Sequence, residues 1–380
     1  MERKCKIITI ALFLIILFGV GIFTVLNGGK KYSVFEKRDL AKFPKTNVKT
    51  ITKAKFQSGL DNFLNDHVVF RDQCIYTTTM VDKIMGRAEK AGVYFGEDGY
   101  LIEKPVEVKP ADMKENVKYL SKFVNMASKG MGSKNVKVVL IPNKENVLAD
   151  KMPKYAPVST DNIKMKEMLW EELKDKNQIV DLTKALQKHK DEYIYYKTDH
   201  HWTSLGAKYG YEAMMDAMGE KKLTGEKSKV VSDDFLGTTY NKIHYAPQKD
   251  LITKYDIKTA ENVDVVCEDS EEIDQNDSLY YEKALKKADK YEYFMGGNFG
   301  VLGVHTGCKN GKTLVLLKDS FANCIIPFLS NNYENIIMID VRYLGSSIFE
   351  TLEQLEKIDK LVVLFNDEKL MSNNNLWTLE

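Results

Sequence analysis

Short, continuously apolar runs that alternate with helical patterns constrain the fold of this chain more than any other feature of its sequence. The apolar runs lie at residues 136–141, 179–182, 313–317, 336–340 and 361–365. Helical spacing accompanies them over residues 112–128, 160–174, 183–189, 204–218, 321–329 and 348–357. Strands without a polar face are typical of a parallel sheet whose two faces are both covered. The sequence therefore predicts an α/β fold with a parallel sheet flanked by helices.

Polar side chains follow the predicted strands at their carboxyl ends, which is where open parallel sheets form their sites. These side chains are Asn143, Asp181, Asp319, Ser320, Asp340, Asn366 and Asp367. At Ser320 a buried strand turns into a helix, which would expose the hydroxyl beside the free N–H groups of that helix. Those N–H groups could stabilise an oxyanion, although Asp319 or Ser320 could also serve only as the helix cap.

The alternation of strands and helices stops between residues 220 and 311. This region holds β-like runs at 263–267 and 291–295, and we interpret it as an inserted β-rich subdomain. The surrounding α/β domain is expected to cover residues 112–380. Residues 28–111 are expected to form a linker, a helical pattern over 51–75, and a hairpin over 93–102.

The N-terminus carries an uncharged, mostly apolar run over residues 7–26, preceded by Arg3, Lys4 and Lys6. About twenty such residues suffice to cross a bilayer, and a cleavable signal peptide usually has a shorter apolar region. We therefore expect residues 1–27 to be a retained signal anchor with a transmembrane helix, the alternative being a cleaved signal peptide. Basic residues also follow the run closely, so the count of charges does not decide the orientation.

Charge and cysteine content exclude some classes of function. The chain has 55 basic and 54 acidic residues, a balance that argues against nucleic acid as the main partner. Its five cysteines form no CxxC or zinc-like pattern, and no disulfide can be assigned from their positions. The triplet Gly-Lys-Thr at 311–313 lacks the earlier glycine of a P-loop and leads into a strand, whereas a P-loop leads into a helix.

The stretch 195–203 concentrates more potential chemistry than any other run, because Asp199, His200, His201 and Trp202 are consecutive. In an extended backbone Asp199 and His201 would point the same way and His200 the opposite way. A carboxylate beside an imidazole fixes the tautomer of the ring, whose other nitrogen can then take the proton of a hydroxyl nucleophile. Ser320 is the candidate nucleophile.

Two other interpretations of this stretch stay open: a hydrogen-bonded turn, and a metal site built from Asp199, His200 and His201. Adjacent histidines cannot easily face one ion, and the other histidines show no ligand spacing, so no metal is expected. Trp202 is either a core residue that fixes the neighbouring ring or a substrate platform.

The run 198–203, with Leu205, Gly206 and Ala207 after it, resembles the signature of the DHHW protein family. That family is similar to the alginate O-acetylation proteins AlgJ and AlgX, whose domain is SGNH-hydrolase-like. Supporting matches lie at 37–44, 70–71, 96–101, 318–321 and 340–343, so the resemblance spans nearly the whole chain after the anchor. It implies an SGNH-hydrolase-like fold.

The resemblance also implies a triad in which Ser320 is the nucleophile, His201 the base and Asp199 the residue that orients the base. The implied reaction moves an acetyl group through an acetyl-serine onto a glycan hydroxyl, or to water, without a cofactor. The resemblance does not extend to the oxyanion donors, because the serine follows the Asp–His pair and no early Gly-Asp-Ser block exists. The candidates are the Ser320 N–H with Asn143 or Asn323, and the candidates for substrate contact are Trp202 and Tyr196.

Three hypotheses of function follow. The first is an anchored, single-pass, extracytoplasmic O-acetyltransferase or esterase that acts on cell-surface polysaccharide, with a membrane-bound O-acyltransferase as acetyl donor. The second is a catalytically silent glycan-binding or assembly protein of a polysaccharide-modification complex. The third is a hydrolase that faces the cytosol. The presence of all three triad residues favours the first.

Overall fold

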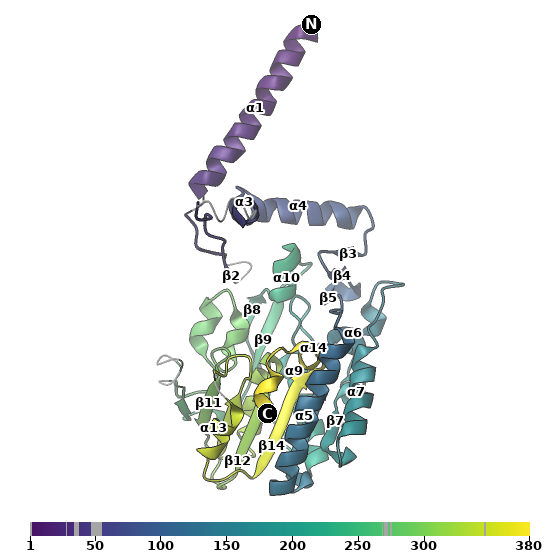
Figure 1. Ribbon diagram of the computed structural model, residues 1–380, viewed down its shortest axis with the longest axis vertical. Helices are drawn as coiled ribbons and strands as arrows, with labels where there is room; N and C mark the ends of the chain where they lie inside the picture. Colours follow the sequence, from purple (N-terminus) through teal and green to yellow (C-terminus); the bar gives the residue numbers. More distant parts are fainter. Residues whose placement is uncertain are drawn as a thin grey trace. The chain divides into compact units, whose positions relative to one another are not determined.

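A computed structural model describes residues 2–27, 29–33, 38–46, 55–267, 269, 273, 276–345 and 347–380. The chain divides into two compact units, one formed by residues 1–91 and 241–245 and the other by residues 92–240 and 246–380 (Figure 1). The boundaries predicted from the sequence, after residues 27 and 111, do not coincide with the division into these two units. They stay a prediction. Residues 28, 34–37 and 47–48 of the predicted linker and residues 51–54 of the helical pattern lie outside the described residues.

The first unit begins with the apolar helix α1 (Glu2–Asn27), which confirms the predicted N-terminal helix. Its segment Lys4–Thr24 is long and apolar enough to cross a membrane. The short strands β1 (Tyr32–Ser33) and β2 (Arg38–Asp39) pair antiparallel. They are followed by α3 (Lys55–His67) and α4 (Arg71–Ile84), and then by β3 (Glu89–Lys90).

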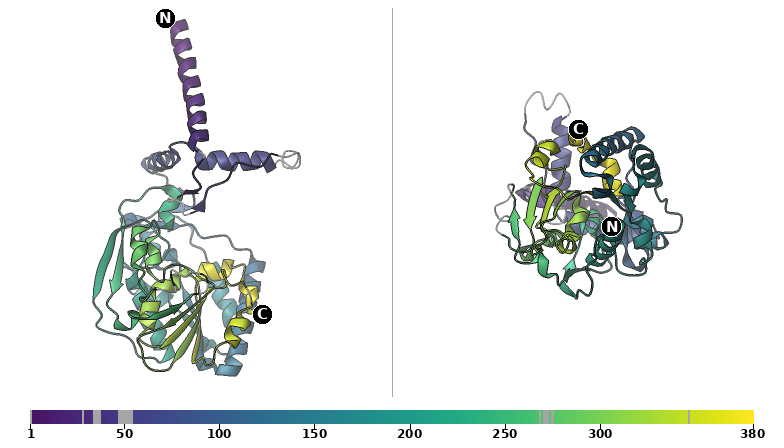
Figure 2. Two further views of the ribbon diagram at one scale, coloured as in Figure 1. Left: turned by 90° about the vertical axis from the view of Figure 1, so that its left-hand side faces the viewer. Right: turned by 90° about the horizontal axis from the view of Figure 1, so that it is seen from below.

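The second unit is built on a seven-stranded sheet in the order β10-β11-β13-β12-β14-β6-β7. Figure 2 shows this twisted sheet from two further sides. The five strands β13, β12, β14, β6 and β7 are parallel to one another, as predicted. The sheet consists of β6 (Val136–Ile141), β7 (Ile179–Asp181), β10 (Asp264–Val266), β11 (Val301–His305), β12 (Thr313–Lys318), β13 (Asn335–Ile339) and β14 (Lys360–Asn366). An antiparallel hairpin of β4 (Val93–Phe95) and β5 (Leu101–Glu103) precedes it, also as predicted.

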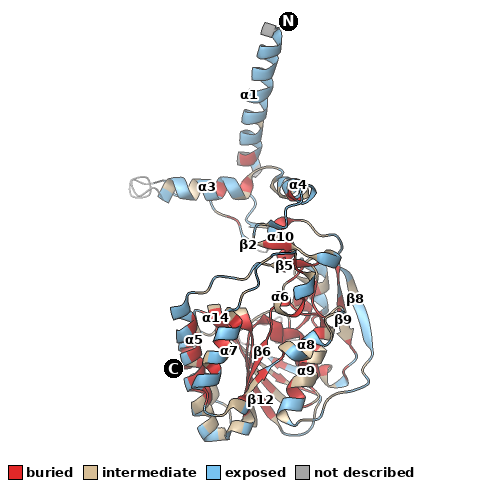
Figure 3. Ribbon diagram, turned by 90° about the vertical axis from the view of Figure 1, so that its right-hand side faces the viewer, coloured by how far each residue is buried: buried red, intermediate tan, exposed pale blue. Residues whose placement is uncertain are grey.

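Helices cover both faces of this sheet, because successive side chains of each strand enter opposite halves of the core. On one face, α5 (Pro110–Met131) and α7 (Asp161–Glu172) pack on Val138 and Leu140. On the other face, α9 (Ser204–Met218) packs on Val139 and Ile141. All residues of β6 and β12 are buried (Figure 3). The remaining helices are α6 (Lys144–Val147), α8 (Thr183–Gln187), α10 (Thr238–Ile243), α12 (Ile326–Leu329), α13 (Ile348–Glu353) and α14 (Asp367–Ser372).

One local prediction is wrong, and another is confirmed only in part. The run 291–295 is not a strand, because Lys290–Tyr293 forms a 3₁₀ turn that Asp289 caps by accepting a hydrogen bond from Tyr291 N. Its aromatic side chains belong to the core all the same. The helix predicted over 321–329 is instead a 3₁₀ turn, Ser320–Cys324, followed by α12, which has a proline in its first turn.

The region 220–311 contributes to the main sheet as well as forming a hairpin. Strands β8 (Ser228–Phe235) and β9 (Asp250–Tyr255) pair antiparallel with two irregularities in register. Strands β10 and β11, by contrast, extend the parallel sheet. Strand β11 pairs antiparallel with β13, and β10 pairs antiparallel with β11.

Candidate active site

Ser320 lies where the central strand β12 ends and the 3₁₀ turn begins. The helix-cap role falls to its neighbour Asp319, whose Oδ1 accepts from Phe321 N at 2.9 Å and whose Oδ2 accepts from Asn366 N at 2.8 Å. Burial raises the pKa of the Asp319 carboxyl. Because Asp319 satisfies the turn, the Ser320 hydroxyl is available for another partner.

That partner is His201. Its Nε2 lies 2.8 Å from Ser320 Oγ, and its Nδ1 lies 2.6 Å from Asp199 Oδ1. An Nδ1–H that donates to the carboxylate leaves Nε2 to accept the serine proton, which is the tautomer that a base requires. The imidazole stacks on Tyr291 at 3.9 Å between ring centroids, and the Tyr291 hydroxyl donates to Ser320 O at 3.0 Å. One tyrosine therefore contacts both ends of the histidine–serine pair.

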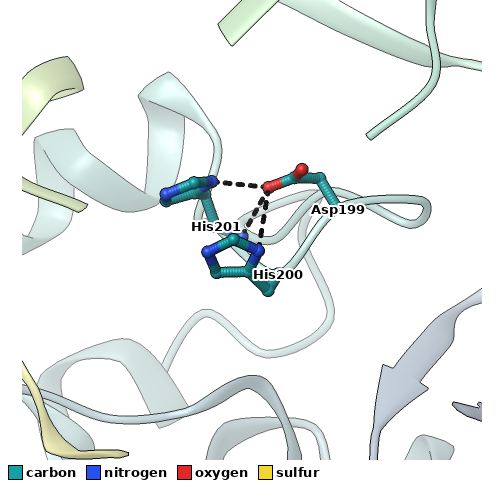
Figure 4. A group of neighbouring side chains, drawn as sticks. All are labelled: Asp199, His200 and His201. Atoms are coloured by element: carbon teal, nitrogen blue, oxygen red, sulfur yellow. Dashed lines mark hydrogen bonds and ion pairs between the residues drawn. The ribbon is translucent and has the colours of Figure 1, made fainter. Parts of the chain in front are cut away.

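The backbone around Asp199 is not extended, so the reasoning from alternating side chains is wrong. Residues 197–201 form successive bends between Tyr195 and Trp202, which pair as an isolated bridge. Asp199 Oδ1 accepts from His201 N at 2.9 Å, which closes a turn of the kind that aspartate favours. This turn brings Asp199 and His201 together. The His200 ring does not point away from His201, because the centroids of the two rings lie 3.9 Å apart (Figure 4).

The second carboxylate oxygen of Asp199 is held from another part of the chain. Asp199 Oδ2 accepts from Thr238 N at 2.7 Å and from Thr238 Oγ1 at 3.0 Å. The approach is so close that a Cβ at the preceding Gly237 would lie 2.1 Å from Asp199 Cβ. Gly237 is therefore required here for space.

Asp250 organises the segment that leads into the site. This buried carboxylate accepts from Tyr193 Oη, Lys197 N, Thr198 N and Thr198 Oγ1. Four donors on one carboxylate fix residues 193–198 and so fix the start of the Asp199 turn.

A buried lysine, Lys144, also supports the turn at Asp199. Lys144 Nζ donates to Asp199 O at 2.6 Å and to Leu101 O at 2.9 Å. Burial lowers the pKa of Lys144 to about 8. Sequence reasoning missed Gly237, Thr238, Asp250 and Lys144, since no local motif marks them.

His200 is a neutral neighbour of the pair. Desolvation, with a further contribution from His201, lowers the pKa of His200 to about 3, although 26% of its side chain is exposed. Its Nδ1 lies 2.6 Å from Thr238 Oγ1. The ligand-type atoms of Asp199, His200 and His201 lie within 4.8 Å of one another, as a metal site requires. A metal ion bound to a ring nitrogen of His201 would displace the hydrogen bond that this nitrogen makes to Asp199 or to Ser320. The absence of metal stays a prediction.

The other candidates from the sequence differ in their burial and in their hydrogen-bond partners. Trp202 and Tyr196 are completely buried, with Trp202 Nε1 donating to Phe321 O at 2.9 Å, so neither presents a surface to a substrate. Asn323 donates to Gly297 O at 3.0 Å and to Asn298 Oδ1 at 3.2 Å, which directs its amide hydrogens into a neighbouring loop.

Asn143 borders a small cavity beside the triad. Its Nδ2 donates to Glu145 Oε1 at 2.9 Å, and its Oδ1 accepts from Asn366 Nδ2 at 2.7 Å. The cavity measures about 40 Å³ and is lined by Glu103, Asn143, Lys144, Glu145, His200, Phe321, Asn366, Glu368 and Lys369. Such a volume admits a water molecule or a small group but no sugar ring. Burial raises the pKa of Glu145 to about 7.

The fold and the arrangement of its site define the class. The chain is an α/β protein with a mainly parallel sheet flanked by helices, and a serine, a histidine and an aspartate are joined by hydrogen bonds at the carboxyl edge of that sheet. A sequence model of the family described as DHHW protein matches residues 112–339, and the chain belongs to this family.

Solved structures to which this chain is similar include a DHHW family protein from Eubacterium siraeum DSM 15702. It is 23% identical, with a TM-score of 0.63, over 77% of this chain and 95% of that chain. Bacillus cereus PatB1 is 18% identical, with a TM-score of 0.60, over 74% and 97%. The O-acetyltransferase domain of Pseudomonas putida AlgJ is 13% identical, with a TM-score of 0.46, over 76% and 95%. No match was found among curated protein sequences.

Proposed function

We propose that this protein is a membrane-anchored, extracytoplasmic O-acetyltransferase, or an acetylesterase, that acts on cell-surface polysaccharide. The observation that supports a covalent mechanism is the hydrogen-bonded chain from Ser320 Oγ through His201 to Asp199. Membership of the DHHW family, with the resemblance to alginate O-acetylation proteins seen in the sequence, supports acetyl as the transferred group.

In the first half of the proposed reaction, Ser320 Oγ attacks the carbonyl carbon of a donor acetyl ester while His201 Nε2 takes the hydroxyl proton. The tetrahedral intermediate collapses with cleavage of the bond to the leaving oxygen, which receives the proton from His201. Asp199 stabilises the imidazolium that forms between the two proton transfers. The products are acetyl-Ser320 and the deacetylated donor.

In the second half, a glycan hydroxyl replaces the leaving group. His201 removes its proton as the oxygen attacks the acetyl carbon, and the same proton returns to Ser320 Oγ when the acetyl-serine bond breaks. Water in place of the glycan gives hydrolysis, so one site supports both the transferase and the esterase variants of the proposal. The small cavity beside His200 is of a size for the acetyl methyl group or a water molecule.

The proposed anchor is α1, whose apolar segment Lys4–Thr24 is followed by a folded chain of more than 300 residues. Polysaccharide at the cell surface requires the catalytic unit to face outward. A membrane-bound O-acyltransferase is the proposed source of acetyl groups, since such a partner would deliver them across the bilayer.

The test is covalent labelling of the full chain in detergent with a sulfonyl fluoride and with an activated acetyl ester. Intact-mass spectrometry should find one adduct, mapping to Ser320, which is missing from Ser320→Ala. A solved PatB1 structure carries a sulfonyl adduct, which makes this probe a practical choice. A folded protein that forms no adduct with either reagent would favour the second hypothesis, a catalytically silent glycan-binding protein.

A further inference from the structure

Helix α4 differs from an ordinary surface helix, because it exposes apolar side chains to solvent and turns charged side chains toward the protein. A row of exposed, uncharged residues follows it at spacings of three and four: Phe70, Cys74, Thr77, Val81, Ile84 and Met85. The exposed fraction reaches 68% for Phe70, 79% for Ile84 and 68% for Met85. Gln73 and Thr78, on the borders of this row, are uncharged too. We call this row the outer face of α4.

The charged residues of α4 lie outside this row, and Asp82 and Lys83 are engaged within the first unit. Asp82 pairs with Lys90 at 2.5 Å and with Arg87 at 3.0 Å. The Lys83 ammonium lies 5.1 Å from the centre of the Tyr245 ring. Thr79, also outside this row, is buried and donates to Ile243 O at 2.8 Å. Thr79, Asp82 and Lys83 therefore contact protein within the first unit, whereas every residue of the outer face is exposed.

Water is a poor environment for the outer face. Scattered apolar residues are ordinary on a surface, but a continuous helical stripe without charge marks an interaction site. Phe70 strengthens the point, because this non-glycine residue has a left-handed backbone with φ of 59° while its side chain stays exposed.

The position of α4 in the first unit indicates what covers the outer face. The turn between α3 and α4 is joined to the end of the apolar helix α1, since Val69 N donates to Thr24 Oγ1 at 3.5 Å. His67 Nε2 lies 3.0 Å from Lys30 O, just after the same helix. Exposed lysines, among them Lys30, Lys31 and Lys42, accompany this junction and suit the anionic headgroups of phospholipids.

We propose that α4 is an interfacial helix, whose outer face lies in the headgroup layer of the membrane that α1 crosses. An amphipathic helix with this distribution lies in the plane of the interface. The inference rests on the proposed anchoring by α1 and is independent of the proposed chemistry at Ser320. It assigns the outer face of α4 a lipid contact, so that the first unit is held to the membrane along a helix as well as by the span.

The experiment uses the native Cys74 on the outer face. In the full chain with Cys5→Ser and Cys308→Ser, Cys74 is the accessible thiol among the described residues, since Cys267 and Cys324 are buried. It is labelled with an environment-sensitive fluorophore, and the protein is reconstituted into vesicles of phosphatidylcholine and phosphatidylglycerol. Lipids brominated near the headgroup then serve as depth-dependent quenchers.

Two matched labels make the outcome specific. Ser58→Cys, with Cys74→Ser, places the probe on the exposed polar side of α3, and Phe13→Cys places it in the middle of α1. We expect shallow bromines to quench the label at 74 several-fold more than the label at 58, and deep bromines to quench the label at 13. Ile84→Glu should reduce quenching at 74 without changing quenching at 13.

Equal, weak quenching at 74 and 58 together with strong quenching at 13 would overturn the interfacial helix and leave the anchor intact. Weak quenching at all three positions would overturn the anchoring, and with it this inference. Shielding of position 74 that depends on protein concentration and not on bromine would assign the outer face to a second copy of the chain instead.

Discussion

Replacing Asp199 by asparagine is expected to disable the site through the tautomer of His201. The carboxylate accepts four hydrogen bonds, two at Oδ1 from His201 and two at Oδ2 from Thr238. Asparagine has one acceptor oxygen, so one of the two backbone N–H groups must face an amide donor. If the amide N–H faces His201 Nδ1, that nitrogen must accept, and the ring proton moves to Nε2. Nε2 then cannot take the proton of Ser320.

The magnitudes follow from these contacts. Each hydrogen bond to a charged group contributes about 1.5–3 kcal/mol, so the loss of one or two of them should lower the free energy of unfolding by roughly 2–4 kcal/mol. A wrong histidine tautomer lowers kcat by about 10⁴-fold in a serine protease. We expect a decrease in the rate of Ser320 acylation of about 10³- to 10⁴-fold, which is larger than partial unfolding could explain.

The assay compares the rate of sulfonyl fluoride labelling with thermal unfolding of the same samples. Asp359→Asn is the matched control, because Asp359 Oδ2 accepts from Thr313 N at 2.8 Å, at the other end of β12 from Ser320. The control should lose stability and keep its labelling rate. Labelling of a folded Asp199→Asn variant at the rate of the parent would refute the assignment of His201 as a base oriented by Asp199.

The remaining predictions concern the support of the site, its pH dependence and metal. Asp250→Asn should slow the labelling of Ser320 by about 10-fold or more while the serine itself is unchanged, because the carboxylate holds the segment before Asp199 through charge-assisted hydrogen bonds; a parent-like rate in the folded variant would contradict this role. Glu145 has a folded-state pKa raised from 4.5 to about 7, so its stabilising effect is present below pH 4.5 and is lost as the pH rises to about 7. Relative to Glu145→Gln, the parent should therefore lose up to about 3 kcal/mol of unfolding free energy across this range, as measured by urea titration, and a constant difference would be evidence against a buried, protonated Glu145. Prolonged treatment with a chelator should leave labelling and thermal stability unchanged; loss of both, with recovery on adding zinc, would establish the metal alternative.

The fold was largely accessible from the sequence because its parallel strands are marked by composition alone. Runs such as 136–141 and 361–365 have no polar face, and burial on both sides of a sheet is the usual reason for that pattern. The run 291–295 misled for a related reason. Its tyrosines and phenylalanine favour strands on average, yet here they pack into the core from a 3₁₀ turn, so tertiary contacts override local preference.

The three residues of the proposed triad could be named from the sequence, because their side-chain chemistry is distinctive, and the structure joins them by hydrogen bonds. The residues that position them could not be named. Asp250 and Thr238 hold the segment through contacts made 38 to 57 positions away along the chain. No periodicity or short motif records such pairs. Gly237 is similar, since its requirement for space comes entirely from the approach of Asp199.

The topology of the sheet explains why Ser320 and His201 meet although 119 positions separate them. The chain leaves β12 for β13 on one side and later returns to β14 on the other side. The carboxyl end of β12 is therefore a switch point, where the connections diverge and leave room for a site. Ser320 occupies that end, and Asn366, at the end of β14, binds the Asp319 beside it. The Asp199 turn, held by Asp250 and Thr238, then reaches the serine from outside the sheet. The serine is placed by the order of the strands and the histidine by a separately held turn. Changes at Asp250 should accordingly alter the reactivity of Ser320 without altering the sheet.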